Sequence, residues 1–234
     1  MPNKFLVSIV VPTLNEEAFL ERTLKALLNQ TISKDRYEIV VCDSSSADNT
    51  VKIAKRYADK VVVCEKHSAG YGRNFGADNT SGKLIGFVDA DTIVSETWVE
   101  GLIESLETAV GCTGPIESLE KDSLKMNIFF TWWGIQSRLS IMAKHPIFPG
   151  FNIGIRKDAF KKIGGFSMEN ITTEDIDLGL KLKKVNRIVF NNKMSVKTST
   201  RRLKEISVPA YIWNGISFAL FGKSRKWSEH RKDF

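Results

Sequence analysis

The chain has 234 residues, of which 42% are hydrophobic and 26% are charged, and its formal net charge is +7. This composition excludes a disordered chain and a protein built mainly of membrane spans, and the length suits a single large α/β domain. The positive charge favours an acidic partner, which can be a phosphate ligand, an anionic membrane surface or a nucleic acid.

A β-branched run at residues 5–11 (FLVSIVV) predicts a buried strand that ends at Pro12. A helix is expected next, with Asn15 as its N-cap. Glu16 and Glu17 would then lie in its first turn, where the helix dipole favours acidic side chains.

The unit of a strand followed by a helix recurs, with further strands expected at residues 37–43, 60–65 and 83–89. This alternation predicts an α/β fold with a doubly wound, mostly parallel sheet and right-handed crossovers. In such sheets, ligands bind outside the carboxyl ends of the strands. We therefore expect the polar residues of 12–16, 43–46 and 89–91 to lie along one edge of the sheet.

The second half of the chain has a different pattern. A long apolar helix is expected at residues 124–142, followed by a strand-like stretch at 149–157, a Gly-Gly-Phe turn at 164–166, and a helix opened by Thr172 or Thr173. This half should pack against the first. The tryptophans Trp132 and Trp133 are either part of the core or an exposed apolar site for a lipid.

The C-terminal segment, residues 205–234, combines an apolar run with a basic tail. The run at 207–222 is shorter than the ~20 residues that cross a bilayer. We expect a C-terminal amphipathic helix there, which either packs on the domain or lies on a membrane surface through residues 207–232.

The three cysteines, Cys42, Cys64 and Cys112, are odd in number and lack metal-ligand spacing, so a reducing compartment is expected. The N-terminal residues do not have the pattern of a secretory signal. The expected location is therefore cytoplasmic, with peripheral association at the inner face of the cell membrane as the alternative.

Asp89 and Asp91 are two carboxylates at the end of the predicted strand 83–89. On an extended chain, residues two apart point to the same side. Such a pair suits Mg²⁺ or Mn²⁺, which takes oxygen ligands from one or two carboxylates, water and substrate phosphates. The alternative is an ordinary turn, in which aspartate is common.

Four segments of the chain resemble successive blocks of the family 2 glycosyltransferases, which have the GT-A fold. They are VSIVVPTLNEEAFLERTL, EIVVCDSSSADNTVKIAKRY, GYGRNFGADNTSGKLIGFVDADT and FPGFNIGIRKDAFKKIGGFSMENITTEDIDLGLKL. The resemblance implies one GT-A domain at residues 1–204, with a nucleotide-binding half at 1–115 and an acceptor and catalytic half at 116–204. It also implies a nucleotide-diphosphate sugar, linked to UDP or GDP, as the donor.

The resemblance assigns roles to residues of the predicted edge. Pro12, Thr13, Glu16 and Asp43 would contact the base and ribose of the nucleotide. Arg73, in the glycine-rich turn, would approach the base or the diphosphate, since arginine matches phosphate geometry.

Three further assignments concern the metal and the sugar. Asp91 would be the main protein ligand of Mn²⁺ or Mg²⁺, and Asp89 would face the ribose or sugar, with a second metal contact as an option. Gly150 and Asn152 would lie near the donor sugar.

Asp175 is implied as the general base that takes the proton from the acceptor hydroxyl, with Glu174 as the less favoured candidate. In-line attack by the acceptor, with the base on the face opposite the leaving diphosphate, inverts the anomeric centre, and a positioned base contributes roughly 10²- to 10⁴-fold. From the residues alone, both acids also suit the first turn of a helix.

The chain departs from the family pattern in two places. It has no late histidine before His230 that could complete the metal site, and Arg201 and Arg202 are the residues we would look to instead for a diphosphate contact. The Q-x-x-R-W signature of processive synthases is also missing. We therefore expect a single transfer, to a hydroxyl or to a polyprenyl-lipid phosphate acceptor.

Three other interpretations compete with this one. A catalytically inactive relative that only binds nucleotide sugars is the main alternative. A nucleic-acid-binding module is disfavoured, since no binding motif is present and the acids would be unexplained. A sugar-1-phosphate nucleotidyltransferase would need a glycine-rich loop with Arg and Lys after the first strand, and the chain lacks it.

Overall fold

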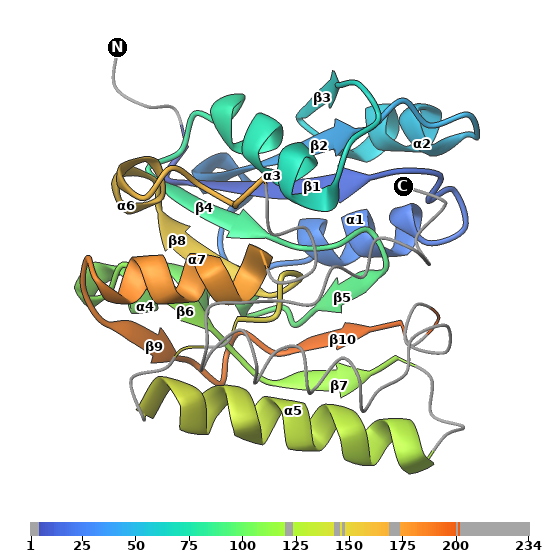
Figure 1. Cartoon of the computed structure of the whole chain (residues 1–234). Helices are drawn as coiled ribbons and strands as arrows, with labels where there is room; N and C mark the ends of the chain where they lie inside the picture. The colour runs from blue at the N-terminus through green and yellow to red at the C-terminus, as the bar shows by residue number, and fades with distance from the viewer. Residues whose placement is uncertain are drawn as a thin grey trace.

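The computed structural model describes residues 5–119, 124–142, 146, 148–168, 174–199 and 201, with only the backbone described for 124–128. Its central element is a seven-stranded sheet with the order β3-β2-β1-β4-β8-β6-β9 (Figure 1). The strands are β1 (Val7–Thr13), β2 (Tyr37–Asp43), β3 (Lys60–Val63), β4 (Leu84–Phe87), β6 (Gly111–Thr113), β8 (Ile153–Arg156) and β9 (Ile188–Phe190).

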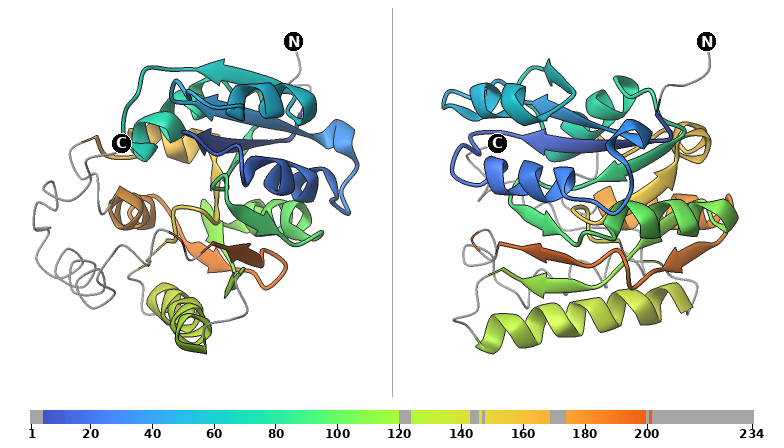
Figure 2. Two further views of the ribbon diagram at one scale, coloured as in Figure 1. Left: turned by 90° about the vertical axis from the view of Figure 1, so that its right-hand side faces the viewer. Right: turned by 180° about the vertical axis from the view of Figure 1, so that it is seen from behind.

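Most neighbours in this sheet are parallel, and β8 alone runs antiparallel to β4 and β6 among the strands described. The crossovers place helices on both faces, which the two views of Figure 2 show from the side and from behind. The predicted doubly wound, mostly parallel α/β sheet is thus confirmed. Its helices are α1 (Leu20–Leu28), α2 (Thr50–Tyr57), α3 (Ala69–Asp78), α4 (Trp98–Thr108), α6 (Lys157–Lys162) and α7 (Glu174–Lys183), with a short 3-10 turn, η1, at Lys34–Arg36.

The alternation of side chains along β1 explains the two layers of core. Val7, Ile9 and Val11 belong to one buried cluster with α1 and α4, whereas Val10 belongs to the other, with α6 and α7. Since successive strand residues point to opposite faces, a strand buried on both sides must be apolar at almost every position. The polar exception, Ser8, donates a hydrogen bond to the buried Glu38 (2.5 Å).

A second sheet of three strands, β5-β10-β7, lies below the first in Figure 1, and α5 (Leu124–Met142) packs beneath it. Its strands are β5 (Thr92–Val94), β7 (Ile116–Ser118) and β10 (Val196–Thr198). The two halves of the chain share one core cluster, because Phe130 and Trp133 of α5 join the residues of β1 and α1. This agrees with the expectation that the second half packs against the first.

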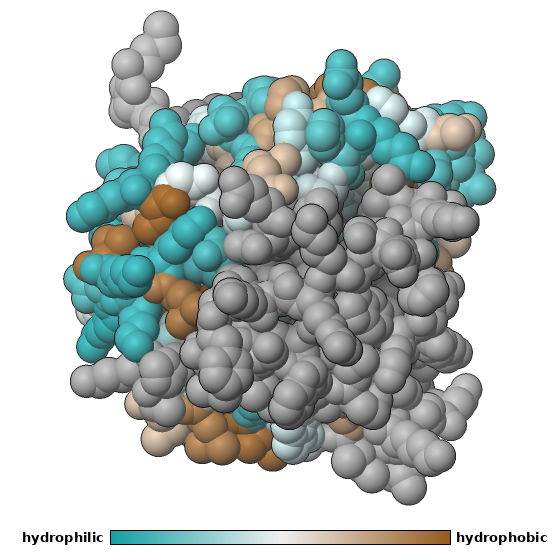
Figure 3. Space-filling view, in the orientation of Figure 1, coloured by the Kyte–Doolittle hydropathy of each residue, from teal (hydrophilic) through white to brown (hydrophobic). Residues whose placement is uncertain are grey.

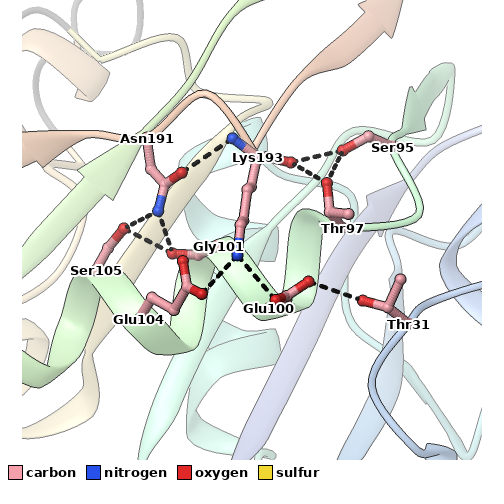
Figure 4. Close-up of polar contacts among 9 residues, drawn as sticks. All are labelled: Thr31, Ser95, Thr97, Glu100, Gly101, Glu104, Ser105, Asn191 and Lys193. Carbon is pink, nitrogen blue, oxygen red and sulfur yellow. Dashed lines mark hydrogen bonds and ion pairs between the residues drawn. The ribbon is translucent and has the colours of Figure 1, made fainter.

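Polar contacts fix the position of β10. Figure 4 shows the connection from β9 to β10 tied to α4. The amine of Lys193 pairs with Glu100 (2.8 Å) and Glu104 (2.6 Å), and Asn191 donates to Ser105 Oγ (3.0 Å). Thr92 and Thr198 are joined across β5 and β10 by their hydroxyls (2.9 Å). These contacts anchor the strand that leads to Arg201.

Two local predictions were wrong. Asn15 does not cap a helix: it has a positive φ of 54°, its N–H donates to Ser46 Oγ, and α1 begins only at Leu20. Glu16 therefore precedes the helix and is buried, not in a first turn. Arg73 lies within α3, not in a turn, because the glycine-rich segment is helical from Ala69.

In the part of the chain that the structure describes, none of the helices has the length and apolar character that a bilayer crossing requires. The predictions for Thr172, Thr173, Arg202, the domain boundary at 204–205 and the segment 205–234 lie outside the described residues.

Candidate active site

The carboxyl ends of β1, β2 and β4 meet at one edge of the main sheet. Thr13 at the end of β1 is the register partner of Asp43 at the end of β2, and its hydroxyl donates to the Asp43 carboxylate (2.9 Å). β4 runs parallel on the other side of β1, so that Asp89 follows at the same edge. The sheet therefore gathers polar groups from three separate strands at one place.

A pocket opens at this edge. It is lined by Pro12, Thr13, Leu14, Ser44, His67, Ala69, Asp89 and Ala90. Asp43 lies beneath it, fully buried, and accepts hydrogen bonds from the backbone N–H and hydroxyl of Ser46 (2.8 and 2.6 Å). Asp43 thus holds the loop after β2 in place at the edge of the sheet.

Arg73 connects the pocket to α7. Its guanidinium pairs with Asp89 (2.7 Å) and with Glu174 (2.6 Å), and it lies over the ring of Phe166 at 5.4 Å. The Arg73 side chain is only 6% exposed. Burial alone would lower the pKa of Arg73, but the two carboxylates outweigh it and raise the pKa above its ordinary value. The arginine is a permanent cation between two acids from distant parts of the chain.

Two glycines make room for this cluster. A Cβ atom on Gly70 would lie 2.4 Å from the Glu174 carboxylate, and one on Gly150 would lie 3.2 Å from the Arg73 guanidinium.

Gly164 and Gly165 have positive φ values of 77° and 71°, which only glycine adopts readily, and they turn the chain so that Phe166 enters the core. The predicted Gly-Gly-Phe turn is thus confirmed, and Phe166 packs in the core.

Asp175 lies in the first turn of α7, beside this cluster, and is partly buried. Burial raises the pKa of Asp175 to about 6, although the positive charge of Arg73 and backbone N–H groups, including that of Gly150, oppose the shift. A carboxylate of this kind accepts a proton at near-neutral pH, which is the property that a general base needs.

Arg201 holds the remaining two acids. Its guanidinium pairs with Asp91 through Nε (3.0 Å) and with Glu16 through Nη2. Both carboxylates are buried, at 7% and 2% exposure, while Arg201 is 32% exposed. Two carboxylates therefore converge on one positive charge at the edge of the sheet.

Carboxylates such as those of Asp91 and Glu16 are also possible ligands of a divalent metal ion. Carboxylate oxygens are the hard ligands that Mg²⁺ and Mn²⁺ prefer, and one or two are enough when phosphate oxygens and water complete the shell. Among the described residues, no group of three or more histidine, cysteine, aspartate and glutamate side chains comes together. A metal ion at Asp91 would therefore need phosphate oxygens and water to complete its shell.

Asn152 lies apart from the other predicted residues. Its side chain is fully buried, accepts from Trp98 Nε1 (2.8 Å), and donates to the carbonyl oxygens of Gly114 (3.3 Å) and Met194 (2.9 Å). This arrangement favours a role in joining α4, β6 and β10 over the predicted contact with a donor sugar.

Two features of the site have no clear counterpart in the sequence pattern. His67 lines the pocket and stacks on Tyr71 with ring centroids 4.5 Å apart. Glu16 was expected at a nucleotide, and its pairing with Arg201 was not foreseen. The glycine-rich segment next to His67 is the one sequence signal for its place in the pocket. No sequence signal indicates the pairing of Glu16 with Arg201.

The chain is similar to known proteins in sequence. The model of the family described as Glycosyl transferase family 2 matches residues 8–164. Glycosyltransferase AglE of Haloferax volcanii is 25% identical over 179 residues, which are 73% of this chain and 59% of that protein.

Two solved structures share the fold. S. aureus TarS 1–349 in complex with UDP-GlcNAc has a TM-score of 0.71 at 19% identity, over 92% of this chain and 65% of that one. The mannosyltransferase PcManGT from Pyrobaculum calidifontis, in complex with GDP-Man and Mn²⁺, has a TM-score of 0.71 at 18% identity, over 94% and 65%. The expected GT-A fold is confirmed. The chain spans less than two thirds of the length of each of these three proteins.

Proposed function

Because the chain belongs to glycosyl transferase family 2, we propose that it transfers one sugar, with inversion, from a nucleotide-diphosphate donor to a hydroxyl or lipid-phosphate acceptor. The observation that carries this proposal is the continuous polar cluster from the pocket through Asp89 and Arg73 to α7, with Asp175 at its far end. A donor site and a base are thus joined through a single arginine.

The proposed reaction is a direct displacement. Asp175 takes the proton of the acceptor hydroxyl while the acceptor oxygen forms a bond to the anomeric carbon. The bond from that carbon to the diphosphate breaks, and its electron pair leaves on the diphosphate oxygen. Since the base and the leaving group are on opposite faces of the sugar, the anomeric centre inverts.

The donor is proposed to bind along the sheet edge. Pro12, Thr13 and His67 would contact the base and ribose from the pocket walls, and Asp89 would accept hydrogen bonds from ribose or sugar hydroxyls. Asp43 would act by shaping the loop beneath the pocket, and Gly150 would leave the sugar room beside Arg73. The UDP and GDP sugars in the two related structures support a nucleotide sugar of either kind.

A divalent metal, Mn²⁺ or Mg²⁺, is proposed to be held by Asp91, with Asp89 as a further candidate. When bound, such an ion neutralises charge on the leaving diphosphate. Arg201 already faces Asp91 and Glu16, so it would shift its pairing or take part in binding the diphosphate. The bound Mn²⁺ of the related mannosyltransferase supports this assignment.

Asp91→Asn tests the metal assignment. We expect Mn²⁺ to tighten nucleoside-diphosphate binding to the parent protein. In the presence of Mn²⁺, the variant should bind the nucleoside diphosphate at least about tenfold more weakly than the parent, a loss of ~1.4 kcal/mol. Calorimetric titration with and without Mn²⁺ measures the effect. Asp35→Asn, which changes an exposed aspartate of η1, is the matched control and should bind like the parent. Equal Mn²⁺ dependence in Asp91→Asn and the parent would contradict the assignment.

A further inference from the structure

Helix α5 is apolar on two opposite sides. On the inner side, Phe130 and Trp133 are buried in the core cluster. On the other side lie four large apolar side chains, which we call the outer face: Trp132 (41% exposed), Ile135 (54%), Leu139 (56%) and Met142 (71%). They recur at intervals of three and four residues, so they form one stripe along the helix.

The outer face of α5 is apolar although it is exposed, whereas Ser137 and Ser140 are buried and Thr131 and Arg138 are the exposed polar side chains described on this helix. A helix on the surface of a water-soluble domain normally carries polar side chains along its whole exposed face. An exposed apolar stripe marks an interaction site.

The outer face gathers four exposed apolar side chains on one helix, and this helix lies at the border of the molecule. In Figure 1, α5 forms the lower edge, and Figure 3 shows apolar atoms gathered along that edge. The other large apolar side chains that are exposed in the described part of the chain, Leu28, Val63 and Met168, belong to α1, β3 and the segment before α7. They are separate from one another along the chain and form no stripe.

Charge indicates what covers the outer face. The sequence contains no aspartate or glutamate between Asp122 and Asp158, although it contains several basic residues there. Arg138, at the flank of this stripe, is exposed, and its guanidinium carbon lies 5.9 Å from the centre of the Phe190 ring of β9. An arginine at the flank can bring its guanidinium to the level of lipid phosphates while the apolar side chains enter the acyl boundary.

The four side chains at these exposures offer on the order of 400 Å² of apolar surface, an area that suits either a lipid surface or the apolar centre of a larger protein interface. A bilayer needs no complementary shape, and an exposed tryptophan near one end of the stripe suits the interface between water and lipid.

We propose that the outer face of α5 is a membrane-docking surface that inserts into the interfacial region of a bilayer containing anionic phospholipids. The helix lies along the surface without crossing it. This inference does not depend on the transfer reaction. It places membrane contact on α5, whereas the sequence suggested residues 207–232 for a membrane surface and offered Trp132 and Trp133 as a site for a lipid; of these two, Trp133 is buried and Trp132 is exposed.

Vesicle flotation with the full chain tests the proposal. The parent protein should float with vesicles that contain phosphatidylglycerol and should bind much less to vesicles of phosphatidylcholine alone. The triple variant Ile135→Ser, Leu139→Ser, Met142→Ser should lose at least about tenfold of that binding, because three side chains no longer leave water. Since these positions are exposed, the variant should unfold at nearly the parent's temperature, which differential scanning fluorimetry checks.

A matched control carries the same chemistry elsewhere. Leu28→Ser, Val63→Ser removes two exposed apolar side chains outside α5 and should float like the parent. Unchanged flotation of the triple variant would overturn the proposal and assign binding to another segment, residues 207–232 included. No flotation of the parent would also overturn it. If the parent is a dimer by sedimentation and the triple variant a monomer, the face binds a second copy and the proposal is wrong.

A site-specific probe gives a second readout. Cys42, Cys64 and Cys112 are buried, so a fluorophore such as NBD attaches selectively to Ile135→Cys. With anionic vesicles, its emission should shift to the blue and should be quenched by spin-labelled acyl chains. The same label on Val63→Cys should not respond. A silent label at position 135 on vesicle-bound protein would contradict the proposal.

Discussion

Asp175→Asn is expected to lower the rate of sugar transfer by roughly 10²- to 10⁴-fold, the range associated with a positioned base. The amide keeps the shape of the side chain and cannot take the acceptor proton. Donor binding should remain close to that of the parent, since Arg73 pairs with Asp89 and Glu174 and not with this carboxylate in the described contacts. The measurement is a comparison of kcat with the dissociation constant of the nucleotide sugar.

Asp177→Asn is the matched control for that variant. Asp177 lies in the same first turn of α7 as Asp175 and pairs with Lys181 (2.7 Å). Unlike Asp175, it has no described contact with Gly150 or Arg73. Its transfer rate should stay within a few-fold of the parent's. Normal turnover by Asp175→Asn would contradict the base assignment.

The same carboxylate predicts a pH profile. Burial raises the pKa of Asp175 to about 6, so the group is protonated and inactive as a base below that pH and ionised above it. The value of kcat/KM should therefore fall as the pH drops through about 6, and the acidic limb should vanish in the residual activity of Asp175→Asn. A limb that persists in the variant would assign the titration to another group.

Arg73→Ala is expected to cost about 3–5 kcal/mol of unfolding free energy, because removing one partner of a buried ion pair leaves an uncompensated charge. Two carboxylates, those of Asp89 and Glu174, lose their shared cation in this variant. Urea unfolding measures the difference. Donor binding should also be lost, since the arginine lies between the pocket and α7.

Arg156→Ala is the control, because it removes an arginine that is exposed and not buried. Arg156 is 43% exposed and pairs with Asp158, itself 70% exposed, so its loss should change stability by no more than about 1 kcal/mol. An Arg73→Ala protein that unfolds at the same urea concentration as the parent would show that the cluster does not hold α3 and α7 together.

Local patterns in the sequence accounted for the main features of the sheet. The buried runs that became β1 and β2 have apolar residues at nearly every position, and the alternation with helices forced their carboxyl ends to one edge. Thr13, Asp43 and Asp89 followed from that rule alone. The helix start near Asn15 could not be predicted, because the residue prefers a link to the loop after β2 over capping a helix.

The contacts that complete the site were out of reach for a different reason. Arg201 and Glu16 are 185 positions apart, and Arg73 and Glu174 are 101 positions apart. No local pattern specifies such pairs, which depend on how the second half folds against the first. Asn152 shows the converse case, since the resemblance that placed it near a donor sugar did not indicate that its amide forms hydrogen bonds inside the core.

The most direct test of the account is donor binding at the edge of β1, β2 and β4. Thermal unfolding should be measured with a panel of nucleoside diphosphates and nucleotide sugars, each with and without Mn²⁺, because a ligand at 100 times its dissociation constant adds about 2.7 kcal/mol of stability. We predict a selective, Mn²⁺-dependent rise for one nucleotide class. Unfolding temperatures that no nucleotide changes, with or without Mn²⁺, would contradict the proposed donor site.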